Sequence, residues 1–308
     1  MLEAIGNTPL VKLRRLNDSS SADVWMKIEG GNPTGSYKDR MALAMIETAV
    51  ERGDLREGVR VLECTGGSTG SSVAFVCAAK GIPCTIISSD SYAREKLDSM
   101  RAFGAELLIE PSVGGAITPD LWQRMRARAK TMADTGNYHW LDQFCNPHAA
   151  LGYKEMGREI ISKIPQPVDA FCGAVGTAGM IMGVGEVLKE KFSSIRIVAL
   201  EPASSAVLSG QSPGSHNIDG TGAGFVPNLF SRKVVSEVRA LAEVDARTMA
   251  RRLARMEGIF AGTSTGLNVI AALQLAKEVG SGGCVVTVAC DTGFKYLQGE
   301  LFCNRDSL

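Results

Sequence analysis

The sequence predicts an α/β protein built on parallel sheets. Apolar segments of strand length alternate with segments of helical periodicity along most of the 308-residue chain. Glycine is abundant, with 34 residues, as expected where many strands turn tightly into helices. Because parallel strands are joined by crossover helices, this alternation favours parallel sheets over antiparallel ones.

The helical pattern of the first half opens at Ser36–Asp39, a capping sequence that predicts a helix from Met41 to about Arg52. Gly53 ends this helix, because glycine readily adopts the left-handed backbone found just after a helix. Further helices are predicted at Ser71–Lys80, Arg94–Phe103 and from Pro119 through Met132, with strands at Val59–Cys64, Cys84–Ser88 and Glu106–Ile109.

The second half repeats the alternation, and we place the domain border near Pro147. The segment Glu201–Arg232 is rich in glycine, serine and proline and is predicted to be a functional loop, since it is too long for a simple connection. Helices are predicted at Ala150–Ile164, Met180–Phe192, Ala246–Glu257 and Leu267–Val279, with strands at Ala170–Val175, Ile195–Leu200 and Val285–Ala289.

Charge and hydropathy exclude several classes of protein. Lys and Arg number 33 and Asp and Glu number 33, so the chain lacks the basic excess of a nucleic-acid binder. No apolar run approaches the length of about 18 residues that suggests a membrane span, and the N-terminus lacks the pattern of a signal peptide. We therefore expect a cytoplasmic protein that contacts neither nucleic acid nor membrane.

Histidine and cysteine spacing predicts no metal site. His139, His148 and His216 lack zinc-ligand spacing with cysteine or glutamate. The cysteines form no C-x-x-C pair and most lie in apolar segments, so we expect buried thiols in a reducing compartment. They are Cys64, Cys77, Cys84, Cys145, Cys172, Cys284, Cys290 and Cys303.

Glycine-rich turns precede helices at Thr65–Gly70, Gly176–Gly179 and Gly262–Gly266. Such turns present unpaired backbone N–H groups at the positive end of a helix, where phosphate or carboxylate binds. Lys38 is the unusual residue nearby, because cations are disfavoured in the first turn of a helix. It is either a solvated surface lysine or an amine whose pKa is lowered by burial, which can form a Schiff base.

Asn32–Arg40 closely resembles the lysine motif of the cysteine synthase family, within the β-family (fold type II) of pyridoxal-phosphate enzymes. Further motifs resemble that family in the same order, so the resemblance covers nearly the whole chain. They are Ile5–Leu10, Thr65–Gly70, Gln143–Pro147, Gly176–Met180, Gly220–Phe225, Gly262–Gly266 and Asp291–Gly293.

The resemblance implies two α/β domains like those of the tryptophan synthase β-subunit. Each would be an open, mostly parallel twisted sheet flanked by helices, with the cofactor in the interdomain cleft. The domains would comprise residues 1–147 and 148–308, with residues 11–35 crossing to the C-terminal domain. A homodimer is also implied.

By the same resemblance, Lys38 is the catalytic residue that carries pyridoxal 5′-phosphate. Thr292 would place a neutral hydroxyl against the pyridine nitrogen, with the adjacent Asp291 as an alternative for that role. The other implied cofactor-binding residues are Ser68, Gly176, Thr177, Ala178, Gly179 and Met180, and the implied substrate-binding residues are Thr65, Gly66, Ser68, Thr69, Gln143 and Gly222.

Several residues depart from the family pattern. Ser68 stands where the family usually has asparagine, and Ala178 and Met180 stand where glycine and threonine are usual. Tyr153 lies near the place of a family histidine. These departures leave cysteine synthesis itself open, but they do not remove the cofactor-binding motifs.

The implied activity is that of a transferase or lyase of cysteine biosynthesis. It would act on a serine- or cysteine-type amino acid through an aminoacrylate, with replacement by sulfide or another nucleophile, or with elimination as in a serine/threonine dehydratase or cysteine desulfhydrase. Two other classes stay open. One is a non-catalytic paralogue that binds a ligand or partner. The other is a serine hydrolase with Ser68 as nucleophile, since Gly66–Gly70 fits G-x-S-x-G.

Overall fold

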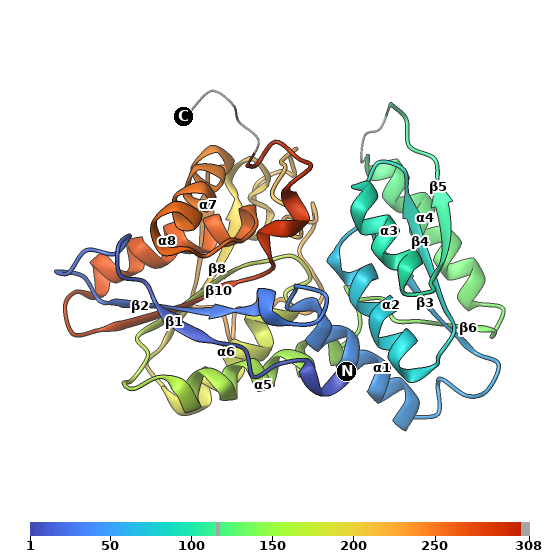
Figure 1. Cartoon of the computed structure of the whole chain (residues 1–308), viewed down its shortest axis with the longest axis horizontal. Helices are drawn as coiled ribbons and strands as arrows, with labels where there is room; N and C mark the ends of the chain where they lie inside the picture. The colour runs from blue at the N-terminus through green and yellow to red at the C-terminus, as the bar shows by residue number, and fades with distance from the viewer. Residues whose placement is uncertain (115–117, 303–308) are drawn as a thin grey trace. The chain divides into compact units, whose positions relative to one another are not determined.

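The computed structural model describes residues 1–114 and 118–302, which form two compact units (Figure 1). Unit 1 comprises residues 1–5 and 38–152, and unit 2 comprises residues 6–37 and 153–308. The chain therefore leaves unit 2 between Tyr37 and Lys38 and returns to it between Gly152 and Tyr153. The α/β class with mostly parallel sheets, predicted from the sequence, is confirmed.

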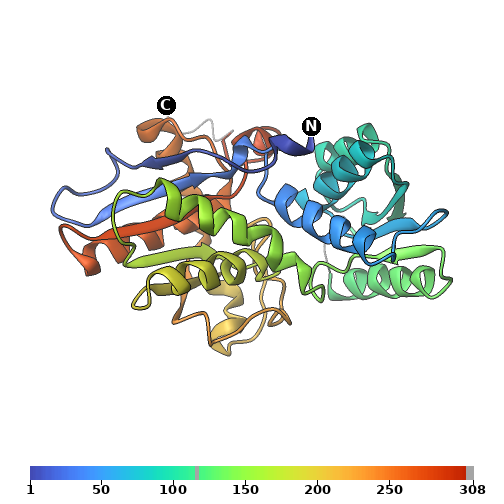
Figure 2. The same cartoon turned by 90° about the horizontal axis from the view of Figure 1, so that it is seen from below.

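Unit 1 is built on a parallel sheet whose strands follow the order β5-β4-β3-β6. Apolar side chains of β3 and β4 pack against α4 on one face, and α1 packs against α2 and α2 against α3 (Figure 2). The strands are β3 (Arg60–Cys64), β4 (Cys84–Ser89), β5 (Glu106–Glu110) and β6 (Tyr138–Trp140), and the helices are α1 (Lys38–Glu51), α2 (Ser68–Lys80), α3 (Arg94–Ala102) and α4 (Pro119–Ala133).

Unit 2 is built on a larger sheet in the order β1-β2-β10-β7-β8-β9. β1 and β2 form an antiparallel pair, and every other neighbouring pair is parallel. The strands are β1 (Leu10–Lys12), β2 (Asp23–Ile28), β7 (Ala170–Ala174), β8 (Arg196–Pro202), β9 (Glu237–Leu241) and β10 (Cys284–Ala289), and the helices are α6 (Gly179–Lys191), α7 (Glu243–Glu257) and α8 (Thr263–Val279).

Helices cover both faces of the sheet of unit 2 (Figure 1). α7 and α8 lie on one face, where they form a core with β2, β7, β8 and β10. α6 lies on the other face together with the second part of α5 (His148–Lys163), the helix in which the chain returns from unit 1. β7 and β10 are buried along their whole length, and their sequences are largely apolar on both faces, as is typical of parallel sheets.

Most predicted helices are present, but several begin earlier than predicted. α1 begins at Lys38 rather than Met41, α2 at Ser68 rather than Ser71, and α8 at Thr263 rather than Leu267. At α2 and α8, small residues assigned to a turn form the first helical turn instead, and at α1 the helix includes Lys38, Asp39 and Arg40. The short strands β1, β2, β6 and β9 were not predicted, because they lack a continuous apolar run.

A buried lysine in β2 ties the N-terminal segment to the sheet of unit 2. Lys27 is fully buried, and its Nζ pairs with Glu159 of α5 and donates to the backbone oxygen of Thr8 at 2.6 Å. The Thr8 hydroxyl donates to Glu29 at 2.6 Å, and the Asn32 amide donates to the other Glu29 oxygen at 2.9 Å. Every charge in this network has an opposite charge or a hydrogen bond, as buried charges require.

Removal of the Lys27 amine is expected to destabilise the protein strongly. Lys27→Ala leaves Glu159 and Glu29 buried with an uncompensated charge, so we expect the free energy of unfolding to fall by about 3–5 kcal/mol. Lys12→Ala is the matched control, since Lys12 on the adjacent strand pairs with Asp23 at 2.6 Å but is one-third exposed. Its loss should cost at most about 1 kcal/mol. Urea unfolding followed by circular dichroism measures both, and equal effects would contradict the prediction.

Candidate active site

Lys38 is the first residue of α1 and is buried, with 7% of its surface exposed. The segment before it is held tightly within unit 2. Gly35 N–H donates to Asn32 at 2.7 Å, and Tyr37 N–H donates to the carbonyl of Cys290 at 3.0 Å. Gly35 has a φ of +73° and lies against Thr292, so neither the backbone nor the space admits a side chain there. Burial rules out the solvated-lysine alternative.

The turn after β3 carries most of the predicted substrate-binding residues of unit 1. Gly67 is the N-cap of α2, so the turn is shorter than predicted, and Ser68 and Thr69 lie in the first helical turn. Thr69 is buried, and its hydroxyl donates to the side-chain oxygen of Gln143 at 2.7 Å. The structure therefore brings together two predicted residues that are 74 positions apart. Because the Gln143 oxygen accepts from Thr69, its amide NH₂ keeps its donors for an anion.

Two side chains pack directly on the glycines of this turn. A Cβ on Gly66 would lie 2.0 Å from the ring of Tyr92, and one on Gly70 would lie 2.4 Å from the methyl group of Met100. The Thr65 hydroxyl accepts from the N–H of Gly67 at 3.2 Å, which fixes the turn from within. These contacts hold the conformation of the turn, whose backbone N–H groups lie at a helix start that suits an anion.

Gln143 follows a residue with left-handed backbone after β6. Asp142, the residue before it, has a φ of +44°, a conformation that aspartate adopts more readily than most other non-glycine residues. Arg126 of α4 binds Asp142 there, because its guanidinium donates to both Asp142 oxygens at 3.0 Å and stacks 4.8 Å over the Trp140 ring. The segment that leads into Gln143 is therefore tied to α4.

Glu63 is a buried carboxyl beneath this turn that the sequence analysis did not single out. Its oxygens accept from the N–H of Cys64 at 2.7 Å and from the N–H of Gln143 at 3.3 Å. The pKa of Glu63 is raised to about 8, chiefly by burial and also by the nearby Asp142 carboxylate, while its hydrogen bonds act in the opposite direction. A glutamate inside the apolar strand Val61–Cys64 was the signal that could have identified it.

In unit 2, the predicted phosphate-binding residues form the start of α6. Ala178 is the N-cap, with a φ of +67°, and Thr177 is buried with its hydroxyl accepting from Gly179 N–H at 3.4 Å. Gly176 has no room for a side chain, since a Cβ would lie 2.2 Å from the carbonyl of Gly220. The methyl of Met180 lies against Gly173 of β7, so Met180 offers the helix start its backbone N–H rather than its side chain.

The predicted loop residue Gly222 lies beside the same turn. Its N–H donates to the carbonyl of Val175 at 3.0 Å, and His216 Nε2 lies 3.1 Å from its carbonyl. Gly222 has a φ of +56°, and a Cβ there would lie 2.4 Å from the His216 ring. His216 therefore braces the loop from within at Gly222, while the Gly222 N–H joins the loop to the segment before α6, a role of His216 that its sequence setting did not reveal.

Thr292 stands at the start of a short 3-10 helix, Gly293–Tyr296, after β10. Its N–H donates to Gly35 at 2.9 Å, and its hydroxyl accepts from Phe294 N–H at 3.4 Å, which leaves the hydroxyl hydrogen as a donor. The carboxylate of the adjacent Asp291 accepts from the Tyr296 hydroxyl at 2.6 Å. This contact favours Thr292 over Asp291 for the proposed position beside a ring nitrogen.

Within residues 1–114 and 118–302, no group of His, Cys, Asp and Glu side chains could hold a metal ion, and no helix is long and apolar enough to cross a membrane. Of the described cysteines, Cys145 is exposed and the others are buried, so the expectation of burial is wrong for Cys145. Cys303 lies outside the described residues.

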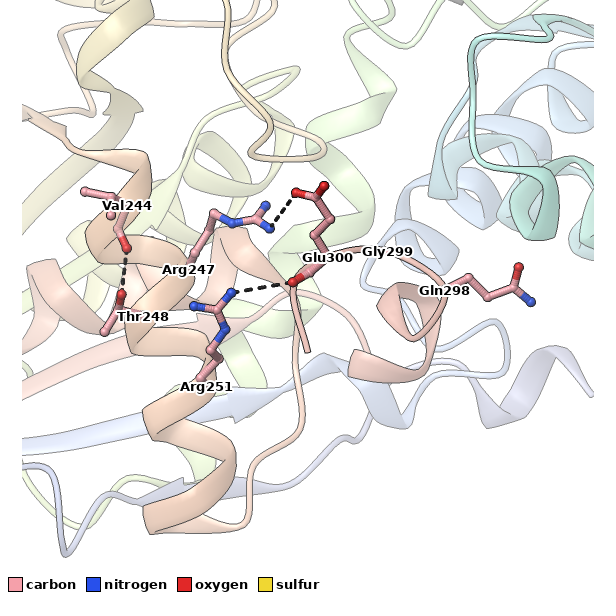
Figure 3. Close-up of a pocket in the computed structure, with 7 residues that line it drawn as sticks. All are labelled: Val244, Arg247, Thr248, Arg251, Gln298, Gly299 and Glu300. Atoms are coloured by element: carbon pink, nitrogen blue, oxygen red, sulfur yellow. Dashed lines mark hydrogen bonds and ion pairs between the residues drawn. The ribbon is translucent and has the colours of Figure 1, made fainter. Parts of the chain in front are cut away.

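A separate hollow of about 580 Å³ lies between α7 and the chain after the last 3-10 helix (Figure 3). Arg247 and Arg251 of α7 point toward Glu300, and Arg251 donates to the carbonyl of Leu301 at 2.6 Å. These arginines are occupied by the chain itself. The hollow is lined by none of the motif residues, and we do not assign the activity to it.

The fold and these motifs define an enzyme that uses pyridoxal phosphate. Residues 1–291 match the family described as "Pyridoxal-phosphate dependent enzyme", and the chain belongs to this family. It is 40% identical over 305 residues to a cysteine synthase of Staphylococcus aureus, covering 97% of this chain and 96% of that one. This match does not support the serine hydrolase alternative.

Solved structures agree with this assignment. An O-acetylserine sulfhydrylase isoform 3 from Entamoeba histolytica is 35% identical with a TM-score of 0.92, covering 98% of this chain and 90% of that one. A hydrogen sulfide-producing enzyme from Fusobacterium nucleatum is 33% identical with a TM-score of 0.88, covering 96% and 97%.

The residues present fit pyridoxal phosphate. The start of α6 offers backbone N–H groups in a turn where Gly176 leaves no room for a side chain, which suits a phosphate. Lys38 offers a buried amine, and Thr292 offers a hydroxyl donor. Ala178 and Met180 replace family residues without closing this turn, because their side chains are buried.

A side chain at position 176 is expected to weaken cofactor retention. Gly176→Val would push the turn away from Gly220 and spoil the close approach of its backbone N–H groups. Gly31→Ala is the matched control, since a Cβ there meets its nearest neighbours at 3.9 Å. After dialysis, bound cofactor is measured by visible absorbance and folding by circular dichroism. A folded Gly176→Val protein that retains the cofactor like Gly31→Ala would refute the prediction.

Proposed function

We propose that this enzyme catalyses β-replacement on O-acetylserine with sulfide to form cysteine, with β-elimination from cysteine-type substrates as a side activity. The observation that carries the proposal is the Thr69–Gln143 hydrogen bond. It joins the two segments expected to bind the substrate carboxylate and leaves the Gln143 amide donors for it. The names of the cysteine synthase and the O-acetylserine sulfhydrylase support the choice of substrate.

Pyridoxal phosphate, when bound, withdraws electrons from the substrate α-carbon and so weakens the bonds to the α-proton and the β-leaving group. The Lys38 amine would hold this cofactor covalently and, once free, would take the substrate α-proton as a general base.

The turn Thr65–Thr69 and Gln143 bind and orient the substrate carboxylate. Backbone N–H groups at the start of α2 and the amide of Gln143 supply the donors, and the rings and methyls packed on Gly66 and Gly70 keep the turn in place. Thr177 and the backbone from Gly176 to Met180 bind the phosphate. Gly222 lies beside this turn, on the side of the substrate.

Thr292 would tune the electron-withdrawing power of the bound cofactor. A hydroxyl hydrogen bond to a ring nitrogen does not fix a proton there as a carboxylate does. The cofactor would then supply weaker electron withdrawal, which would suit prompt loss of a β-leaving group better than a long-lived carbanion. Asp291, which would fix such a proton, is engaged by Tyr296 instead.

The direct test supplies the purified holoenzyme with O-acetylserine and sulfide and measures cysteine. A parallel assay supplies cysteine alone and measures sulfide, pyruvate and ammonia. A higher kcat/KM in the first assay supports replacement as the main reaction. A higher value in the second assigns the protein to elimination, as in the hydrogen sulfide-producing relative, and activity in neither refutes the proposal.

We also propose that the enzyme is a cytoplasmic homodimer, as the family resemblance implies. Light scattering on a sizing column measures the mass in solution against the monomer mass of 32.7 kDa. A monomer would contradict this part of the proposal and leave the proposed reaction intact.

Lys38 is predicted to be the residue that carries the cofactor. Borohydride reduction of the holoenzyme should attach the cofactor to the peptide that contains Lys38. Lys27 is the internal control, because it is equally buried but is engaged by Glu159. Lys38→Ala should abolish the labelling and the activity. Label on another peptide, or none, would show that the role is misassigned.

Position 68 is predicted to tune the choice of substrate. A charge-assisted hydrogen bond is worth about 1.5–3 kcal/mol, so gaining an amide donor in Ser68→Asn should raise kcat/KM for O-acetylserine and sulfide relative to other substrates by about ten- to a hundredfold. Ser68→Ala should retain the cofactor but discriminate less. If neither variant changes substrate preference, specificity lies in Gln143 or the Gly220–Phe225 loop.

A further inference from the structure

Glu63 lies beneath the turn assigned above to the substrate carboxylate. It is 1% exposed, and its two oxygens bond to the backbone at both ends of that site: one to Cys64 at the end of β3, the other to Gln143. One carboxyl group therefore joins the strand that leads into the turn with the segment that supplies the amide.

The surroundings of Glu63 contain little charge that could compensate an ionised carboxylate. Asp142 faces it from the segment after β6, and Arg126 of α4 is engaged by Asp142 through two 3.0 Å contacts. The thiols of Cys64 on its own strand and Cys84 on β4 are neutral. The pKa of Cys64 is raised by burial, and that of Cys84 by a hydrogen bond with Cys77 and by burial. More distant groups are Glu110 of β5 and Arg60 at the start of β3.

We propose that Glu63 is a positioning residue that must be uncharged for the substrate carboxylate to bind well, so that its ionisation sets the alkaline limit of substrate binding. The inference rests on the proposed function, which places a carboxylate at the Thr65–Thr69 turn. A neutral Glu63 keeps Gln143 in place without adding a negative charge below that carboxylate. An ionised Glu63 holds the same N–H groups but repels the substrate.

The direction of the Glu63 titration agrees with this role. Its pKa is about 8 in the folded protein against 4.5 for an ordinary glutamate, with burial as the largest cause. The protonated form is thus favoured in the folded state. Its contribution to stability is complete below pH 4.5 and is lost as the pH rises through about 8. As the pH rises through about 8, Glu63 ionises and the site gains a negative charge.

The test measures binding of L-alanine, an amino acid without a β-leaving group, to the holoenzyme through the cofactor absorbance at pH 6.5 and 9.5. The wild type is compared with Glu63→Gln, which is uncharged at both pH values. The ratio of their Kd values cancels the titration of the ligand and of Lys38. We expect a ratio near one at pH 6.5, and wild-type binding weaker than Glu63→Gln by on the order of tenfold at pH 9.5.

Glu201→Gln is the matched control. Glu201 is also 1% exposed and accepts two backbone N–H groups, from Leu208 at 2.7 Å and Ser209 at 3.0 Å, but it belongs to unit 2. It should follow the wild type at both pH values. A merely structural role of Glu63 would alter the Kd of Glu63→Gln equally at both pH values, and that result, or the same pH effect in Glu201→Gln, would overturn the inference.

A second variant keeps the inference testable if Glu63→Gln does not fold. Asp142→Asn removes the like charge that faces Glu63 and releases Arg126, so the pKa of Glu63 should fall and the rise in Kd should begin at lower pH. An unchanged onset overturns the inference. A wild type whose absorbance responds to neither L-alanine nor O-acetylserine at any pH refutes the proposed function and the inference together, whereas a response with a pH-independent ratio refutes the inference alone.

Discussion

The buried amine of Lys27 is the interaction on which the placement of Lys38 depends. It pairs with Glu159 of α5 and binds the backbone of Thr8, and through Thr8 and Glu29 it reaches Asn32. A charge this deeply buried tolerates little displacement, because each lost contact leaves an unpaired polar group at a cost of kilocalories.

Asn32 opens the segment that leads to Lys38, so the network acts on the site through the backbone. The amide oxygen of Asn32 accepts from Gly6 N–H at 2.8 Å, its carbonyl accepts from Gly35 N–H, and Tyr37 binds β10 at Cys290. These contacts fix the direction in which the chain leaves unit 2. Lys38 follows directly as the first residue of α1, so the same contacts set the direction of its backbone.

The sequence was sufficient for the fold class and for most helices, because long periodic segments carry strong signals. The sequence did not predict the short strands. β2 contains Asp23 and Lys27, so it lacks an apolar run, and its strand conformation depends on pairing with β10, which is more than 250 residues away in the chain. β1 and β6 are three-residue strands that exist only through their neighbours.

The start of α2 was predicted three residues too late, at Ser71 rather than Ser68, for a different reason. Serine, threonine and glycine at positions 66–70 have low helix propensity, so the turn was extended to Gly70. In the folded chain, Thr69 is bonded to Gln143 and Gly70 is covered by Met100, and these contacts outweigh the local preference. The chain passes from unit 1 to unit 2 inside α5, between Gly152 and Tyr153. Because this point lies within a helix, no change in composition marks it, and the border was expected near Pro147 instead.

The residues of the candidate site could be predicted where they lie in a recognisable motif. Residues that only support the motif residues through contacts could not be predicted. Lys38, Thr69 and Thr177 lie in the glycine-rich or lysine motifs themselves. Glu63 and Arg126 lie in an ordinary strand and an ordinary helix, and their roles arise from contacts that cross the sheet of unit 1. A lone carboxyl in an apolar strand is the visible signal of such a residue, because burial of a charge requires compensation.

These supporting residues point to one electrostatic principle in the proposed chemistry. The substrate brings its own carboxylate, and the groups proposed to bind it are uncharged donors: backbone N–H groups at the start of α2 and the Gln143 amide, whose oxygen accepts from the Thr69 hydroxyl. The cation of Arg126 lies behind Gln143 and is committed to Asp142. A direct arginine contact would bind a carboxylate more tightly in substrate and product alike, and such uniform binding slows product release without accelerating the reaction. Neutral donors on a rigid turn orient the substrate and still allow it to leave.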